Sequence, residues 1–176
     1  MKSKVLLCVD DDTTVLSALS TLLGKNLGSG VILEVAESGA EAMEICAELQ
    51  AEGKEISVIV SDFIMPGMRG DELLVRIHEK SPHTVKIMLT GQSDLEGVKR
   101  SIDEANLYRF MEKPFNNMDV VMTAKLALQV YGRERELLST IDALKADNEQ
   151  LQLRLAQRHG GPTDSADSHP VPSSTP

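Results

Sequence analysis

The chain has 176 residues, 41% of them hydrophobic, which is enough for one globular domain with an extension. Its formal net charge of -9, without a cluster of Lys and Arg, argues against nonspecific binding to nucleic acid or to an anionic membrane. No apolar run approaches the roughly 20 residues of a membrane span, and none near the start resembles a signal peptide. We therefore expect a cytoplasmic protein in which Cys8 and Cys46 are buried and reduced.

Short apolar runs alternate with amphipathic stretches along the first 130 residues. The predicted strands cover 4–10, 31–37, 56–61, 85–90 and 107–112, and the predicted helices cover 14–26, 39–51, 71–79, 95–104 and 117–130. Two helix starts have the spacing of a capping box, Ser38 with Glu41 and Ser93 with Glu96. This alternation predicts an α/β fold, a doubly wound parallel sheet with right-handed crossovers and helices on both faces.

Beyond Tyr131 the apolar residues follow a heptad repeat. Leu137, Leu144 and Leu151 occupy d positions, and Ile141, Asn148 and Leu155 occupy a positions. We expect a coiled-coil helix over residues 131–158 that forms a homodimer, because one Asn at an a position favours a parallel two-stranded coil. The alternative is an amphipathic helix that folds back on its own domain.

Two further expectations concern the ends of this helix. Extended backward, the seam of the coil would pass through Val130, Ala127 and Val120, and Gly132 could bend the helix, since Gly costs a helix interior roughly 1 kcal/mol. Residues 159–176 are mostly Gly, Pro, Ser, Thr, Asp and His, and we expect them to be disordered.

Polar residues close the predicted strands. The first strand ends in three carboxylates, and later strands end in single polar residues: Asp10, Asp11 and Asp12, then Asp62, Thr90 and Lys113. The carboxyl ends of parallel strands meet at one edge of the sheet, so these side chains should converge on one crevice. Like charges held together are costly unless a cation joins them, and a hard, oxygen-binding ion such as Mg²⁺ fits that need. Mg²⁺ in turn often accompanies a phosphate.

This set of residues suits phosphoryl transfer to a carboxylate. A divalent ion beside Asp62 would offset the repulsion between its carboxylate and incoming phosphoryl oxygens, and attack would give an acyl phosphate. Lys113 would supply positive charge to a phosphoryl oxygen, and the Thr90 hydroxyl could donate a hydrogen bond to the product.

Residues 4–130 resemble the receiver domain of two-component response regulators. The matching motifs are Val-Asp-Asp at 9–11, Asp-Phe-Ile-Met-Pro-Gly-Met-Arg-Gly at 62–70, Leu-Thr-Gly at 89–91 and Lys-Pro-Phe at 113–115. The resemblance implies a flavodoxin-like sheet with strand order 2-1-3-4-5 and a receiver domain over residues 1–130. It further implies that a sensor histidine kinase or a phosphotransfer protein phosphorylates Asp62.

The resemblance also implies the roles of individual residues. Asp10, Asp11, Asp62 and the carbonyl of Ile64 would bind Mg²⁺, with Mn²⁺ as a substitute, and the Lys113–Pro114 bond would be cis. Thr90 would couple to Phe110, so that the surface of the fourth and fifth helices changes on phosphorylation. No turnover beyond self-phosphorylation and autodephosphorylation is expected.

The rest of the chain bears on which downstream target a phosphorylated receiver would act on. No DNA-binding motif, ATPase loop or cyclase follows the fifth predicted helix. We expect contact with a downstream protein partner rather than with nucleic acid or membrane. The alternative is that the chain is part of a longer regulator with an effector domain beyond the coil.

Two rival functions remain. Asp10-Asp11-Asp12-Thr13-Thr14 also fits the Asp-x-Asp-x-Thr motif of haloacid-dehalogenase-like phosphatases, in which Asp10 would be the nucleophile and Asp12 the general acid. That reading leaves Asp62 unexplained. The second rival is an unphosphorylated receiver-like scaffold kept for its coiled coil, against which the complete set of acidic residues, Thr90 and Lys113 argues.

Overall fold

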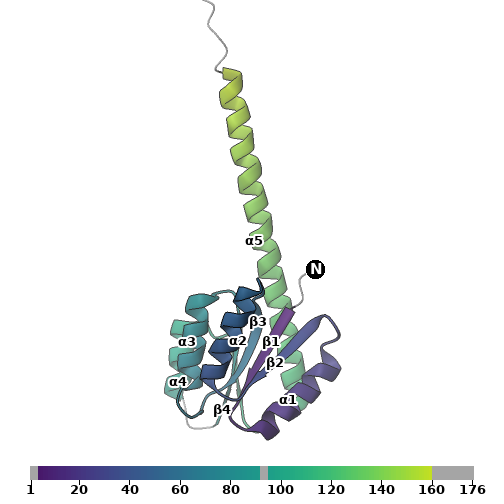
Figure 1. Ribbon diagram of the computed structural model, residues 1–176, viewed down its shortest axis with the longest axis vertical. Coiled ribbons are helices and arrows are strands. Elements are labelled where there is room, and N and C mark those ends of the chain that lie inside the picture. Colours follow the sequence, from purple (N-terminus) through teal and green to yellow (C-terminus); the bar gives the residue numbers. More distant parts are fainter. Residues whose placement is uncertain (1–3, 92–94, 160–176) are drawn as a thin grey trace, which may run out of the picture. The chain divides into compact units, whose positions relative to one another are not determined.

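The computed structural model describes residues 4–91 and 95–159, which form five strands and five helices in alternation (Figure 1). The strands are β1 (Lys4–Val9), β2 (Val31–Ala36), β3 (Ile56–Asp62), β4 (Val85–Thr90) and β5 (Arg109–Glu112). The helices are α1 (Thr13–Asn26), α2 (Gly39–Ala51), α3 (Gly70–Lys80), α4 (Leu95–Ala105) and α5 (Asn117–His159). Ser93 of the predicted capping box lies outside the described residues, and so does the predicted tail apart from its first residue, His159.

The strands form one parallel sheet in the order β2-β1-β3-β4-β5, which confirms the predicted flavodoxin-like topology. Alternate residues of β1 enter different cores: Val5 and Leu7 pack with α2, α3 and α4, whereas Leu6 and Cys8 pack with α1 and α5. Because both faces of the sheet are covered, its central strands are buried along nearly their whole length and are mostly apolar. Both cysteines are buried and free.

Local signals set several helix starts. Asp12 is the N-cap of α1 and accepts a hydrogen bond from the Thr14 amide (2.8 Å), and Ser38 caps α2 by accepting one from the Glu41 amide (3.2 Å). Each cap satisfies an amide that has no partner inside its helix. The Glu41 carboxylate accepts from the Glu37 amide (2.7 Å), one residue earlier than the capping box requires.

One expectation about the last helix needs correction. Val120 and Ala127, placed on the backward extension of the coiled-coil seam, are almost fully buried in the core with α1. The apolar residues that α5 exposes before Gly132 have a spacing of four instead: Met118, Met122, Leu126 and Val130. The helix also continues through Gly132 without ending there.

Contacts at the amino ends of three strands hold α5. The Lys4 ammonium donates to the Leu128 carbonyl (3.0 Å), Tyr131 donates to Glu55 (3.2 Å), and His83 contacts Glu134 (2.9 Å). A Cβ atom on Gly132 would lie 2.9 Å from the Lys4 ammonium nitrogen, closer than side chains approach. The Gly at this helical position therefore leaves room for the Lys4 contact.

The chain divides into two compact units, Met1–Glu136 and Leu137–Pro176. The described part of the second unit is helical, and it exposes the apolar residues of the predicted heptads: Leu137, Ile141, Leu144, Leu151 and Leu155. No helix within the described ranges is both long enough and apolar enough to cross a bilayer.

Candidate functional site

The carboxyl ends of four strands bring the predicted site residues to one edge of the sheet. Asp10 directly follows β1, Asp62 ends β3, Thr90 ends β4 and Lys113 directly follows β5. The strand register pairs Asp62 with Leu89, one residue before Thr90, so these ends are neighbours. The predicted crevice therefore forms from residues about a hundred positions apart in sequence, as in the contact between Asp10 and Lys113.

Three carboxylates meet at this edge. One oxygen from each of Asp10, Asp11 and Asp62 lies within 4.8 Å of the others. Asp10 and Asp62 are buried, whereas Asp11 is exposed to solvent. The cluster is thus open on one side and shielded from water on the other.

Lys113 pairs with two of these carboxylates. Its ammonium nitrogen lies 2.8 Å from Asp10 Oδ2 and 2.7 Å from Asp62 Oδ1. Burial opposes the charge of Lys113, but the hydrogen bonds to Asp10 and Asp62 outweigh it and raise the pKa of Lys113. Burial also raises the pKa of Asp62, although Lys113 acts in the other direction. The Lys113–Pro114 peptide is cis, as the resemblance implies.

The cluster fits a divalent cation. Three carboxylates face one ammonium group in the part of the chain that the structure describes, so the site carries surplus negative charge. One oxygen of each carboxylate lies within 4.8 Å of the others, near enough for all three to reach a single ion. Carboxylate oxygens are also the donors that Mg²⁺ prefers. Such an ion would neutralise the surplus charge.

Asp12 has a different role from its two neighbours. Its amide donates to Asp10 Oδ1 (2.9 Å), while its carboxylate caps α1. The hydrogen bond from the Thr14 amide lowers the pKa of Asp12, which is fully exposed. A general acid must hold a proton at neutral pH, so this position does not suit the acid role that the phosphatase alternative requires.

The loop after β3 holds the Asp62 carboxylate from the other side. The Ile64 amide donates to Asp62 Oδ2 (3.1 Å), and the Phe63 amide donates to the Leu89 carbonyl (2.8 Å). The Ile64 side chain is 64% exposed and lies outside the core. Asp62 therefore has one oxygen on Lys113 and the other on the backbone of its own loop.

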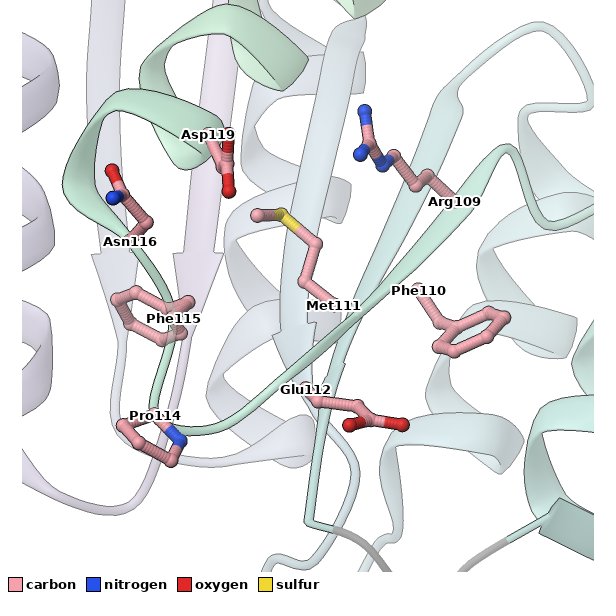
Figure 2. A pocket seen from close by; sticks show the side chains of 8 residues that line it. All are labelled: Arg109, Phe110, Met111, Glu112, Pro114, Phe115, Asn116 and Asp119. Carbon is pink, nitrogen blue, oxygen red and sulfur yellow. The ribbon is translucent and has the colours of Figure 1, made fainter.

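Thr90 and Phe110, the predicted switch pair, are in contrasting environments. The Thr90 side chain is buried, and its hydroxyl donates to the Gly91 carbonyl (3.0 Å). Phe110 is 43% exposed, so it is not a core residue. It lines a groove of about 380 Å³ beside β5, and in Figure 2 its ring points away from Phe115 and Asn116.

One contact near the site was not predicted from the sequence. The Arg69 guanidinium lies over the Phe63 ring, 4.5 Å from its centroid, and its Nε is 3.3 Å from Asp71 Oδ1. The available signal was an Arg at the start of α3, where cations are unfavourable. This contact adjoins the residue that follows Asp62.

The fold and the acidic edge define a receiver-type signalling domain. Residues 6–125 match the response regulator receiver domain family, and the chain belongs to that family. This membership supports a two-component receiver over the phosphatase alternative.

Related proteins agree with this assignment. The hydrogenase transcriptional regulatory protein HoxA of Cupriavidus necator is 26% identical over 89% of this chain and 31% of its own length. The DNA-binding transcriptional regulator NtrC of Escherichia coli K12 is 29% identical over 77% of this chain and 27% of its own length. The signal receiver domain of an HD domain-containing protein from Pseudomonas fluorescens Pf-5 superposes with a TM-score of 0.67 at 29% identity, covering 77% of this chain and 94% of that one. The chain therefore spans less than a third of these two curated relatives.

Proposed function

We propose that Asp62 accepts a phosphoryl group from the phosphohistidine of a sensor histidine kinase or a phosphotransfer protein. The observation that carries this proposal is the surplus of negative charge: three carboxylates within 4.8 Å beside the ammonium of Lys113. If the protein's own cations neutralised all the carboxylates, the site would have no need of a metal ion. The excess negative charge instead favours binding of a divalent cation, which can in turn bind a phosphoryl group.

The reaction is a displacement at phosphorus. A carboxylate oxygen of Asp62 attacks the phosphorus atom, the bond between phosphorus and the imidazole nitrogen breaks, and an acyl phosphate forms on Asp62. Asp10, Asp11, Asp62 and the Ile64 carbonyl would hold Mg²⁺ or Mn²⁺, which offsets repulsion between the carboxylate and the phosphoryl oxygens. Lys113 keeps its charge because its pKa is raised, and it stabilises the oxygens of the transferred group.

The response passes from Thr90 to the surface near Phe110. Once Asp62 carries a phosphoryl group, the Thr90 hydroxyl exchanges the Gly91 carbonyl for a phosphoryl oxygen. Phe110, which is partly exposed without phosphate, then moves inward and changes the surface formed by α4, β5 and α5. A downstream protein recognises that change.

Dimerisation belongs to the second part of the chain. We place the receiver domain at residues 1–130 and a coiled-coil homodimer at residues 131–158. Support comes from the apolar a and d residues, which are more than a third exposed in the single chain. Exposed apolar residues at heptad spacing are stabilised when a second helix covers them.

Labelling by a small phosphodonor tests the phosphorylation site. The intact chain is incubated with acetyl phosphate and Mg²⁺, and the product is measured by intact mass and by lability to hydroxylamine, which cleaves acyl phosphates. We expect one phosphoryl group on the parent, none on Asp62→Asn, and parental labelling on Asp12→Asn, because Asn also caps helices. Equal labelling of Asp62→Asn and the parent would refute the proposal.

Light scattering tests the coiled coil, with and without beryllofluoride and Mg²⁺. We expect a dimer for the parent and a monomer for a variant with Leu144→Lys and Leu151→Lys, which put charge on the seam. The matched control is Leu153→Lys, because Leu153 is 64% exposed but lies off the seam. A parent that stays monomeric in both states would remove the coiled-coil claim.

A further inference from the structure

Helix α3 begins with a residue that local rules disfavour. Arg69 is its N-cap and makes no side-chain capping hydrogen bond. Ser, Thr, Asp and Asn are the usual N-caps, and a cation at a helix N-terminus faces the positive end of the helix dipole. Departures from local rules cluster at functional sites. The reason for Arg69 at this position should therefore lie in its tertiary contacts rather than in capping of α3.

The Arg69 side chain folds back over the residue next to Asp62. Its guanidinium stacks on the Phe63 ring at 4.5 Å, and its Nε lies 3.3 Å from Asp71 Oδ1. Phe63 and Asp71 are both buried, at 1% and 5% exposure, whereas Arg69 remains largely exposed. A planar guanidinium can stack on a ring and pair with a carboxylate at the same time, which a Lys ammonium cannot do equally well.

The backbone closes the same loop. The Gly70 amide donates to the Phe63 carbonyl (2.9 Å), and a Cβ atom on Gly70 would overlap the Asp62 carbonyl oxygen. The loop thus leaves the sheet after Asp62, and its last residue, Gly70, packs against the Asp62 backbone. Ile64, whose amide binds the Asp62 carboxylate, lies inside this closed loop.

We infer that Arg69 is a positioning residue for phosphorylation, acting through Phe63 and Asp71. The guanidinium holds the loop of residues 63–70 closed, so that the Asp62 carboxylate and the Ile64 carbonyl keep the arrangement that a divalent cation and a phosphoryl group require. This inference rests on the proposed function, because it assigns a role in the same reaction. Misplacement of a reacting group by about 1 Å can cost about a hundredfold in rate.

The test compares two arginines of similar exposure. Arg76 lies further along the same helix and pairs with Glu72 (2.6 Å), so it serves as the control. Arg69→Ala, Arg69→Lys and Arg76→Ala are made in the full chain. For each we measure the rate of labelling by acetyl phosphate as a function of Mg²⁺, the Mg²⁺ dissociation constant by calorimetry, and the melting temperature.

We expect Arg69→Ala to lower the labelling rate about tenfold and to weaken Mg²⁺ binding several-fold, with Arg69→Lys only partly restoring either. Arg76→Ala should stay within about twofold of the parent, because an exposed ion pair on a helix contributes little. Both Ala variants should melt within about 4 °C of the parent. A change in rate and metal affinity without a matching change in stability separates positioning from a general structural role.

Several outcomes would overturn the inference. Equal labelling rates and Mg²⁺ affinities for Arg69→Ala and Arg76→Ala would overturn it. It would also be overturned if the labelling rate of Arg69→Ala fell only in proportion to the fraction of that variant that is unfolded. If the parent chain is not labelled at Asp62, the proposed function fails first. The Mg²⁺ affinity measured by calorimetry then tests Arg69 independently of phosphorylation. An unchanged affinity in Arg69→Ala would reject its positioning role, and a weakened affinity would support that role for the metal ligands.

Discussion

The two edges of the central sheet hold charge in opposite ways. At the carboxyl edge, three carboxylates lie together among the described residues, and the ammonium of Lys113 pairs with two of them, Asp10 and Asp62. At the amino edge, charged groups have partners within the chain. Lys4 binds the Leu128 carbonyl, Glu55 accepts from Tyr131, and His83 contacts Glu134.

Lys86 shows the contrast most clearly. It lies near the amino end of β4, is fully buried, and donates to the carbonyls of Pro82 (3.2 Å) and Thr84 (2.7 Å) and contacts His78 (3.0 Å). Three partners satisfy the three donors of an ammonium group. A buried charge with all its partners is part of the architecture, whereas a cluster with surplus charge indicates a site for an external ion.

The largest effect should follow removal of Lys113. Lys113→Met leaves Asp10 and Asp62 facing each other without their cation, and we expect the labelling rate with acetyl phosphate to fall about 100- to 1,000-fold. The control is Lys54→Met, because the pair of Lys54 with Glu52 is exposed. A fall of less than about threefold for Lys113→Met would show that the charge at this edge does not serve the reaction.

The convergence of the candidate site residues was predictable because it depends on topology. Apolar runs located the strand ends, and the connection rules for parallel sheets brought Asp10, Asp62 and Lys113 together. The contacts of Arg69 and Lys86 were not predictable in the same way. A charged residue within an apolar strand is ordinarily assigned to the surface, and only the tertiary structure supplies the carbonyls that satisfy Lys86.

The last helix shows a second limit of sequence reasoning. The sequence pattern fixes the rotation of a helix about its axis only to within about one residue, or 100°. An error of that size assigns Val120 and Ala127 to the exposed face, although Met122 and Leu126 are the exposed residues. Gly132 suggested a bend because helix propensity is a local measure. Its partner, Lys4, is more than a hundred residues away in sequence and could not be inferred from that neighbourhood.

The next effect concerns the pH dependence that Lys86 gives to stability. Burial lowers its pKa from 10.5 to about 8. Below pH 8 Lys86 is charged in both states, and between about pH 8 and 10.5 the unfolded chain binds more protons, so the contribution of Lys86 to folding stability rises with pH by about 3 kcal/mol. The urea-unfolding free energy of the parent should therefore rise relative to that of Lys86→Met over this range.

The comparison with Lys86→Met is needed because other groups act in the opposite direction. Burial raises the pKa of Cys8 from 9.0 to about 12, which lowers stability as the pH rises above 9 in both proteins. Taking the difference between the two unfolding curves removes that contribution. A difference that stays constant from pH 7.5 to 10.5 would mean that Lys86 keeps its ordinary pKa, and that its three partners compensate fully for the burial of its charge.

A smaller effect should follow addition of Mg²⁺. Binding to the folded state alone stabilises it by about 1.4 kcal/mol when free Mg²⁺ is ten times its dissociation constant. We expect this gain in the parent and its loss on chelation, measured by urea unfolding at pH 7. Asp11→Asn, at the exposed member of the cluster, should lose most of the gain, whereas Lys86→Met, at the other edge, should keep it. Equal stabilisation of Asp11→Asn and the parent would place the ion elsewhere.

The smallest effect tests how the amino edge holds α5. Helix propensity alone predicts that Gly132→Ala stabilises by about 1 kcal/mol, but the added Cβ would lie 2.9 Å from the Lys4 ammonium and displace it from the Leu128 carbonyl. We therefore expect little or no gain from Gly132→Ala in the parent and the full gain in a Lys4→Met background, measured by urea unfolding of all four proteins. An equal gain in both backgrounds would mean that the Lys4 contact contributes nothing, since only interacting positions depart from additivity. The Gly in the middle of this helix would then have no explanation in the packing around it.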